Sequence, residues 1–180
     1  GYWVDHAIDY TFPGPDGPSK RQALINDFVN YVNTFKNDPA ILIWGLSNEN
    51  NVDFCNVCIF GTNCNREAQA TGYYQLMNDM ALAAKTVDNH PIMIVSSEPM
   101  DDLINHANNI PDVDLIGINS YRGYNFNGLS GEPNLFYKFN QYFPNKSMII
   151  TEFGVDAWNT NGHDTDPQNG FEDQLNQSIV

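Results

Sequence analysis

Two apolar runs of this chain each end on a glutamate, and they constrain its fold more than any other feature. The run ILIWGLSNENN at residues 41 to 51 leads to Glu49, and MIITEFGVDAW at residues 148 to 158 leads to Glu152. Short, partly β-branched runs of this kind are typical of strands that are buried on both faces of a parallel sheet. The pattern therefore predicts two buried strands that each bring a carboxylate to the carboxyl end of the sheet.

The order of the remaining segments predicts an α/β fold. The first helix is expected to begin with a capping box at Ser19 and Gln22, just after Pro18. Apolar residues then recur at the spacing of one helix face, at Leu24, Phe28, Tyr31, Val32 and Phe35. Strands are expected at 1–8, 40–46, 91–97, 113–121 and 147–153, with helices at 19–37, 66–89, 99–108, 132–143 and 171–179. This alternation is typical of a parallel α/β fold.

Polar residues gather where the expected strands end. In chain order they are Asp5-His6, Asn48-Glu49, Ser96-Ser97-Glu98, Asn119-Ser120-Tyr121 and Thr151-Glu152. The carboxyl ends of parallel strands form the active face of α/β folds, whether the sheet closes into a barrel or stays open. We therefore expect these side chains to converge on one site.

Two glutamates in one cleft suit a particular chemistry. Burial raises the pKa of a carboxyl group, and two neighbouring carboxyl groups push each other's pKa values apart. Glycoside hydrolysis needs such a pair, with one acid to protonate the leaving oxygen and one carboxylate to attack the anomeric carbon. The same pair could instead bind a divalent metal, for which Asp5 and Asp9 are the further candidate ligands.

Composition argues against several other functions. The net charge is -14 with only 8 basic residues, so nucleic acid is not an expected partner. No apolar run is long enough for a membrane span, and no glycine-rich phosphate loop follows a strand.

Three cysteines, Cys55, Cys58 and Cys64, lie within one short stretch. A loop disulfide plus a free thiol, or three reduced thiols, is preferred to a zinc site for them. The sequence does not fix the cellular location of the protein, although an extracellular or periplasmic location is preferred.

Three segments carry a resemblance to a known family. DPAILIWGLSNENN resembles the fourth-strand motif of clan A glycoside hydrolases, and MIITEFGVDAW resembles their seventh-strand motif. DLIGINSYRGY between them is similar to the sixth-strand segment, which ends in a tyrosine. Together the segments most resemble the catalytic barrel of glycoside hydrolase family two, with family five the nearest competitor.

The resemblance implies a (β/α)8 barrel of the TIM type and a retaining double displacement on a β-linked glucan, mannan or galactoside. It implies that Glu49 is the acid/base and Glu152 the nucleophile. By the same resemblance, Asn48 binds the 2-hydroxyl of the sugar and Tyr121 orients the nucleophile. Plainer roles are a turn former for Asn48 and a packing residue for Tyr121. A carbohydrate is the expected partner, and neither a metal nor an organic cofactor is expected.

The resemblance covers nearly the whole chain, yet the chain matches only strands three to seven of the barrel. We expect residues 1–180 to form one partial catalytic domain, without the arginine and tryptophan that the family takes from its second and eighth strands. Such a piece on its own is expected to fold poorly and to show little activity. A transglycosylase, or an inactive barrel that binds carbohydrate, is an alternative to the hydrolase.

For four other residues, the sequence is compatible with two different roles each. His6 could reach substrate from the end of the third strand or serve a structural role. Trp158 and Tyr124, in loops after strand ends, could stack on sugar rings or pack within their loops. Glu98 could contact substrate or cap the helix that follows it.

Overall fold

The computed structural model describes residues 1–54, 65–121 and 134–154. Its sheet contains β1 (Trp44–Leu46), β2 (Ile92–Ser97), β3 (Leu115–Ser120) and β4 (Ser147–Phe153) in the order β1-β2-β3-β4. All three neighbouring pairs are parallel. The helices are α1 (Gly17–Phe35), α2 (Arg66–Ala84), α3 (Asp101–Asn105) and α4 (Leu135–Tyr142), with short 3₁₀ turns at Asn50–Val52 and Ala107–Asn109. Strands and helices alternate, as the sequence predicts.

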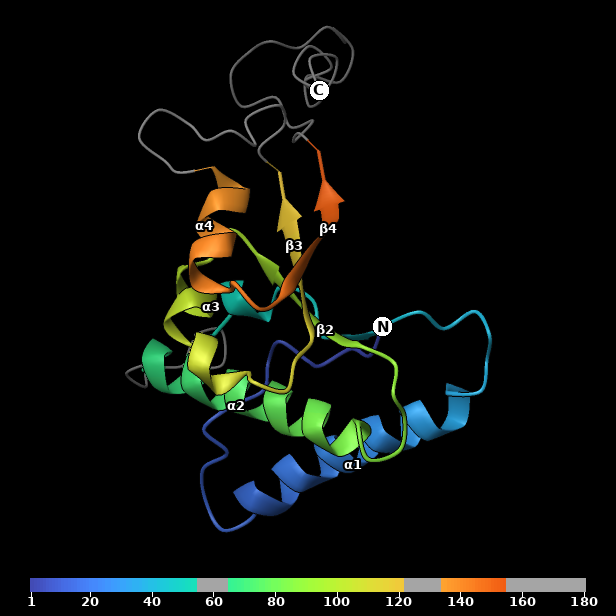
Figure 1. The fold of residues 1–180 in the computed structure, drawn as a ribbon. Coiled ribbons are helices and arrows are strands. Elements are labelled where there is room, and N and C mark those ends of the chain that lie inside the picture. Colours follow the sequence, from blue (N-terminus) through green and yellow to red (C-terminus); the bar gives the residue numbers. More distant parts are fainter. Residues whose placement is uncertain (55–64, 122–133, 155–180) are drawn as a thin grey trace, which may run out of the picture.

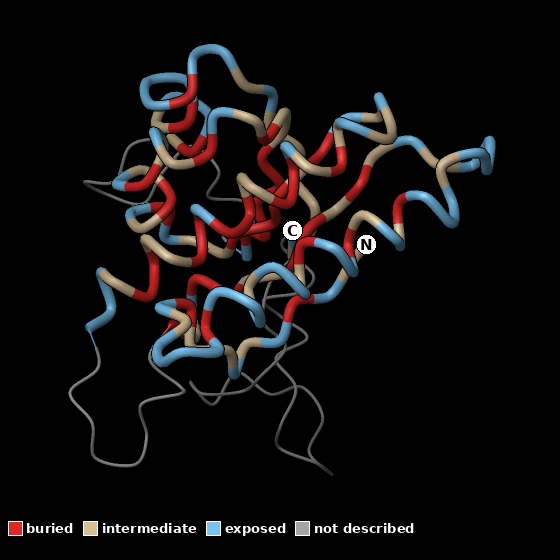
Figure 2. Tube along the Cα trace, turned by 90° about the horizontal axis from the view of Figure 1, so that it is seen from below, coloured by how far each residue is buried: buried red, intermediate tan, exposed pale blue. Residues whose placement is uncertain are grey.

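The helices pack on one side of the sheet. In Figure 1, α1 and α2 run side by side below the strands, and α3 and α4 lie beside β2 and β3. The core between these layers includes Ile92, Ile94, Ile116 and Ile118, whose side chains alternate along β2 and β3. Figure 2 shows the buried residues recurring along each described helix, which is the pattern of elements that bury one face.

The second helix starts at the predicted residue but ends at Ala84, before the predicted end at residue 89. It begins at Arg66, where the side chain of Asn65 caps it by accepting a hydrogen bond from the Ala68 amide at 3.1 Å. The sequence predicts one apolar face of Tyr73, Leu76, Met77, Met80, Ala84 and Val87; the first five are buried in the helix, and Val87 lies beyond its end. Within the described ranges, no helix is long and apolar enough to cross a membrane.

The predicted strand at 1–8 is wrong apart from one bridge. Tyr2 pairs in parallel with Leu46, through hydrogen bonds from the Tyr2 amide to Gly45 and from the Ser47 amide to Tyr2. After this bridge β1 ends, because Ser47 takes a left-handed backbone conformation. Residues 3–8 therefore have no neighbouring strand with which to continue a ladder.

The predicted strand at 40–46 is shorter than expected. Only Trp44–Leu46 belongs to β1, whose first residue pairs with Ile92. The residue before Ile92 is Pro91, which has no amide hydrogen to extend the ladder. The preceding residues instead form a turn, in which the Ile41 amide donates to the Asp38 carbonyl at 3.1 Å.

The predicted capping box at Ser19 is also wrong. The helix begins earlier, at Gly17, with Asp16 as its N-cap residue and Pro18 in the first turn, where proline is favoured. The Ser19 hydroxyl donates to the Asp16 carbonyl at 2.9 Å instead of accepting from an amide. On the predicted face, Phe28 and Val32 are buried while Phe35 is 44% exposed.

Candidate active site

Glu49 lies on a turn with an unusual backbone. The turn follows β1, and both Ser47 and Glu49 have positive φ angles, of 59° and 56°. Residues other than glycine adopt this conformation rarely, and it is costly unless tertiary contacts hold it. Two contacts do so here, since the Glu49 amide donates to the Val95 carbonyl at 3.1 Å and the Ser47 hydroxyl bonds the Tyr73 hydroxyl at 2.5 Å.

Two buried asparagines after Glu49 anchor the same turn. The Asn50 amide group donates to the carbonyl of Val4 at 3.0 Å and to the hydroxyl of Tyr10 at 2.8 Å. Asn51 exchanges two hydrogen bonds with the backbone of Ser97, at 2.9 and 3.0 Å. These bonds tie the turn to neighbouring segments on either side. No role for Asn50 or Asn51 is predicted from the sequence, although a run of four polar residues after a buried strand is a signal for such anchoring contacts.

Glu152 owes its position to an irregularity in β4. Ile118 pairs with Ile150, but the next pair along the two strands is Asn119 with Glu152. The residue between, Thr151, is therefore one extra residue on β4, as in a β-bulge. The bulge brings Glu152 directly opposite Asn119, where a regular ladder would have placed Thr151.

Asn119 connects the two ends of the site. Its side-chain amide donates to Oε1 of Glu49 at 2.9 Å and to Oδ1 of Asn48 at 3.2 Å. Its own Oδ1 accepts a hydrogen bond from the Thr151 hydroxyl at 2.6 Å. Asn119 is 1% exposed, so these bonds lie away from solvent. The sequence predicts that Asn119 lies among the strand-end residues, but it predicts no role for this side chain.

Gly117 makes room for this arrangement. A Cβ atom at Gly117 would lie 2.9 Å from the Thr151 methyl group, 3.0 Å from a Val95 methyl group and 3.1 Å from the Met93 sulfur. Contacts this short force neighbouring atoms to shift. A glycine therefore allows β2, β3 and β4 to pack closely just below the polar cluster.

Tyr121 contacts the second glutamate directly. Its hydroxyl donates to Oε2 of Glu152 at 2.6 Å, and its side chain is 57% exposed beyond the end of β3. This hydrogen bond is the main cause that raises the pKa of Tyr121, followed by desolvation and by the negative charges of Glu152 and Glu49. The hydroxyl therefore lies within electrostatic reach of both carboxylates.

His6 lies at the edge of the same cluster with both ring nitrogens engaged. Nδ1 is 2.6 Å from the Asp53 carboxylate, and Nε2 is 2.8 Å from the Asn48 backbone carbonyl. These contacts agree with the structural interpretation of His6. Tyr124 and Trp158 lie outside the described residues, so their expected contacts with a sugar ring remain predictions.

Glu98 links two strand ends. Its Oε2 accepts a hydrogen bond from the buried Ser120 hydroxyl at 2.5 Å. The helix that follows has Met100 as its N-cap residue. Both interpretations of Glu98, substrate contact and helix capping, stay predictions.

The two aspartates considered as metal ligands are engaged elsewhere. Asp5 accepts a hydrogen bond from the Ala7 amide at 2.8 Å, and Asp9 accepts from Thr11 and from Gln69. Burial acts to raise the pKa of Asp9, but these hydrogen bonds outweigh it and the pKa lies below its ordinary value. Across residues 1–54, 65–121 and 134–154, no group of three or more histidine, cysteine or acidic side chains could hold a metal ion.

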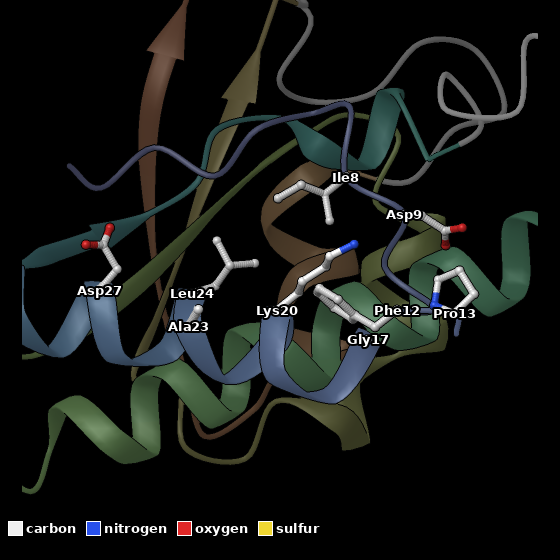
Figure 3. Close-up of a pocket in the computed structure, with 9 residues that line it drawn as sticks. All are labelled: Ile8, Asp9, Phe12, Pro13, Gly17, Lys20, Ala23, Leu24 and Asp27. Atoms are coloured by element: carbon white, nitrogen blue, oxygen red, sulfur yellow. The ribbon is translucent and has the colours of Figure 1, made fainter. Parts of the chain in front are cut away.

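Asp9 borders a hollow that is separate from the strand-end cluster. This hollow, of about 690 Å³, lies between the segment after His6 and the first half of α1 (Figure 3). Its lining is mostly apolar and includes Ile8, Phe12 and Leu24. None of the polar residues around Glu49 and Glu152 lines it, so the hollow is not part of the candidate active site.

The fold and the strand-end residues define a class of protein, an α/β barrel unit with acidic groups at the carboxyl edge of its parallel sheet. The family described as "Glycosyl hydrolases family 2, TIM barrel domain" matches residues 5–180. The chain therefore belongs to this family, and its four parallel strands are part of a (β/α)8 barrel. A comparison with curated protein sequences found no match.

Solved structures agree with the barrel fold. The chain is similar to a β-glucuronidase of Bacteroides uniformis, with a TM-score of 0.60 and 19% identity over 81% of this chain and 17% of that one. It is similar to a β-glucuronidase of Ruminococcus gnavus, with a TM-score of 0.52 and 18% identity over 93% of this chain and 27% of that one. It is also similar to a β-glucosidase of Pyrococcus furiosus, with a TM-score of 0.52 and 16% identity over 86% of this chain and 47% of that one. The chain thus spans less than half of each of these proteins.

Proposed function

We propose that the chain carries the catalytic centre of a retaining β-glycosidase, with Glu152 as nucleophile and Glu49 as acid/base. Membership of a glycoside hydrolase family supports the reaction class. The position of Tyr121 is the single observation that carries the assignment of residues. Its hydroxyl donates a hydrogen bond to Glu152, and the negative charge of Glu49 contributes to raising the pKa of that hydroxyl. A retaining enzyme needs two carboxyl groups in one cleft, about 5 to 5.5 Å apart.

The surroundings of each glutamate support its role. The hydrogen bond from Tyr121 favours the ionised form of Glu152, which is the form that attacks the anomeric carbon. Asn119 orients Glu49 through a hydrogen bond to one of its oxygens. The other carboxyl oxygen is then the one proposed to give its proton to the leaving oxygen and later to accept a proton from water.

The substrate is proposed to be a β-linked glycoside. Asn48 is proposed to meet the 2-hydroxyl of the sugar, where a hydrogen bond strengthens as the transition state forms. The solved relatives named above include β-glucuronidases and a β-glucosidase, so β-glucuronides and β-glucosides belong in a substrate panel beside β-mannosides and β-galactosides.

The stereochemistry of the first product tests the proposal. The complete gene product is incubated with the panel, and proton NMR records which anomer of the sugar forms before mutarotation. A retaining enzyme releases the β-anomer first, and Glu152→Ala and Glu49→Ala each abolish or strongly reduce turnover. Glu67→Gln is the matched control, because the Glu67 side chain is 75% exposed on α2. The α-anomer as first product would contradict the retaining mechanism, and binding without turnover by folded protein would contradict the enzyme.

A further inference from the structure

We propose that His6 is a positioning residue, a doubly protonated imidazolium that holds the Asn48 carbonyl and so fixes the turn that carries Glu49. Its protonation follows from hydrogen bonding alone. Its effect on catalysis rests on the function proposed above, so the two parts need separate measurements.

Counting donors and acceptors gives the charge of the ring. Nδ1 lies 2.6 Å from Oδ2 of Asp53, and Nε2 lies 2.8 Å from the backbone oxygen of Asn48. A carbonyl oxygen and an ionised carboxylate accept hydrogen bonds but cannot donate them. Both ring nitrogens must therefore carry a proton, which only the imidazolium form provides.

The remaining contact of the ring suits a positive charge. The indole of Trp3 stacks on the imidazole with ring centroids 5.1 Å apart and the planes 10° from parallel. A cation over the face of a tryptophan is attracted by the negative face of the ring. The His6 and Asp53 side chains are only 23% and 28% exposed, so water screens their ion pair less than it would at the surface.

The bond from Nε2 acts at a point where the backbone needs support. Asn48 lies between Ser47 and Glu49, whose φ angles are both positive. Its amide donates to Oδ1 of Asn50 at 3.3 Å, and its carbonyl accepts from His6. The peptide groups on both sides of Asn48 are thus held, and with them the start of the Glu49 backbone.

The other described histidines do not share this arrangement. His90 pairs through Nδ1 with Asp88, at 2.9 Å. His106 donates from Nδ1 to the Asp102 carbonyl, while its Nε2 lies 3.2 Å from both the Thr71 hydroxyl and the Glu67 carboxylate. The Thr71 hydroxyl can donate to a neutral His106 ring, whereas neither hydrogen-bond partner of His6 can donate.

NMR on the unaltered protein tests the protonation. In the complete gene product labelled with ¹⁵N-histidine, long-range proton–nitrogen spectra report whether each ring nitrogen carries a proton, and His6→Gln identifies the His6 signals by their loss. We expect both His6 nitrogens to be protonated at neutral pH, and Asp53→Asn to remove the proton from one of them. A single protonated nitrogen in the unaltered protein would overturn the proposal, whether or not the protein hydrolyses any glycoside.

Kinetics with two leaving groups test the positioning role. His6→Leu is expected to lower kcat/KM about ten- to a hundredfold on an alkyl glycoside, whose leaving group needs a proton, and much less on a dinitrophenyl glycoside, whose leaving group does not. His6→Gln keeps a donor within reach of the Asn48 carbonyl and should recover part of the loss, while His90→Gln is the matched control. Equal losses on both substrates would overturn the positioning role and leave a purely structural one. If His6→Leu does not fold, Asp53→Asn is compared on the same two substrates.

Discussion

The side-chain amide of Asn119 donates a hydrogen bond to Oε1 of Glu49 at 2.9 Å, across 70 positions of sequence. The same side chain accepts a hydrogen bond from Thr151, the residue before Glu152. One buried asparagine thus joins the strand ends that carry both proposed catalytic carboxylates. The geometry of the site depends on this bridge between β3, the turn after β1, and β4.

Replacing Asn119 should therefore impair catalysis as well as stability. In Asn119→Ala, Glu49 loses the bond that orients it, and kcat/KM is expected to fall about ten- to a hundredfold. Steady-state kinetics measure the effect, and urea unfolding shows how much stability is lost alongside it. Asn30→Ala, on the exposed side of α1, is the control. Unchanged kinetics in folded Asn119→Ala would contradict the role given to the bridge.

The raised pKa of Tyr121 gives a prediction about alkaline pH. An ordinary tyrosine loses its proton near a pKa of about 10, but the hydrogen bond to Glu152 and the nearby negative charges keep the Tyr121 hydroxyl protonated to higher pH. The hydroxyl should thus remain a donor to Glu152 throughout the neutral and mildly alkaline range. Ultraviolet difference titration of the unaltered protein against Tyr121→Phe isolates this group, and ionisation of Tyr121 at or below its ordinary pH would contradict the bond.

Tyr121→Phe also removes the donor itself. Hydrogen bonds to charged groups are stronger than those between neutral groups, so kcat/KM is expected to fall roughly tenfold or more. The loss should appear mainly in kcat, because Glu152 acts in the chemical step. Tyr137→Phe is a matched control, since Tyr137 is 66% exposed on α4. A change in KM alone would indicate that Tyr121 contacts substrate instead of tuning the nucleophile.

Close packing at Gly117 predicts a cost in stability. In Gly117→Ala the added methyl group would lie 2.9 to 3.1 Å from side-chain atoms of Thr151, Val95 and Met93, so these side chains must move away from it. We expect a loss of about 1 to 3 kcal/mol in the free energy of unfolding, measured with urea. Gly45→Ala is the control, because a Cβ atom there would meet nothing closer than 3.7 Å. Equal effects in the two variants would show that the close approach at Gly117 does not matter.

Asn51 should matter for stability in a different way. Asn51→Ala removes the partner of the Ser97 amide and one of the donors to the Ser97 carbonyl, which also accepts from the Ser96 hydroxyl at 3.3 Å. The lost hydrogen bonds are partly buried, so urea unfolding should show a loss of about 1 to 2 kcal/mol. Asn51→Asp keeps the acceptor for the Ser97 amide and should lose less. A loss below that of Asn30→Ala would show that the pairing contributes nothing.

The order of strands and helices was predictable because each element carries its own local pattern. The buried strand around Ile116 and the apolar face of α2 around Met77 are examples. Strand lengths were not predictable, because they depend on the neighbouring strand. Trp44 begins β1 only where β2 provides a partner, and Tyr2 makes a single bridge before β1 turns away.

In the candidate site, too, some features could be predicted from the sequence and others depend on contacts between distant segments. Glu49, Glu152 and Tyr121 stand at strand ends, so their convergence follows from the rule for parallel sheets. The bridging role of Asn119 could not be read from the sequence, because it depends on a bulge at Thr151 and on contacts between distant segments. Whether His6 faces substrate or backbone likewise depends on where Asp53 lies in the folded chain.

Covalent trapping identifies the nucleophile directly. The complete gene product is incubated with 2-fluoro-glycosides of the four sugars named above, and intact mass followed by peptide mapping locates any added sugar. We expect one covalent sugar on the peptide that contains Glu152, formed more slowly in Tyr121→Phe and absent in Glu152→Gln. A sugar attached to another residue would contradict the assignment of the nucleophile. Hydrolysis of the ordinary β-glycosides without any trapped intermediate would contradict the retaining mechanism.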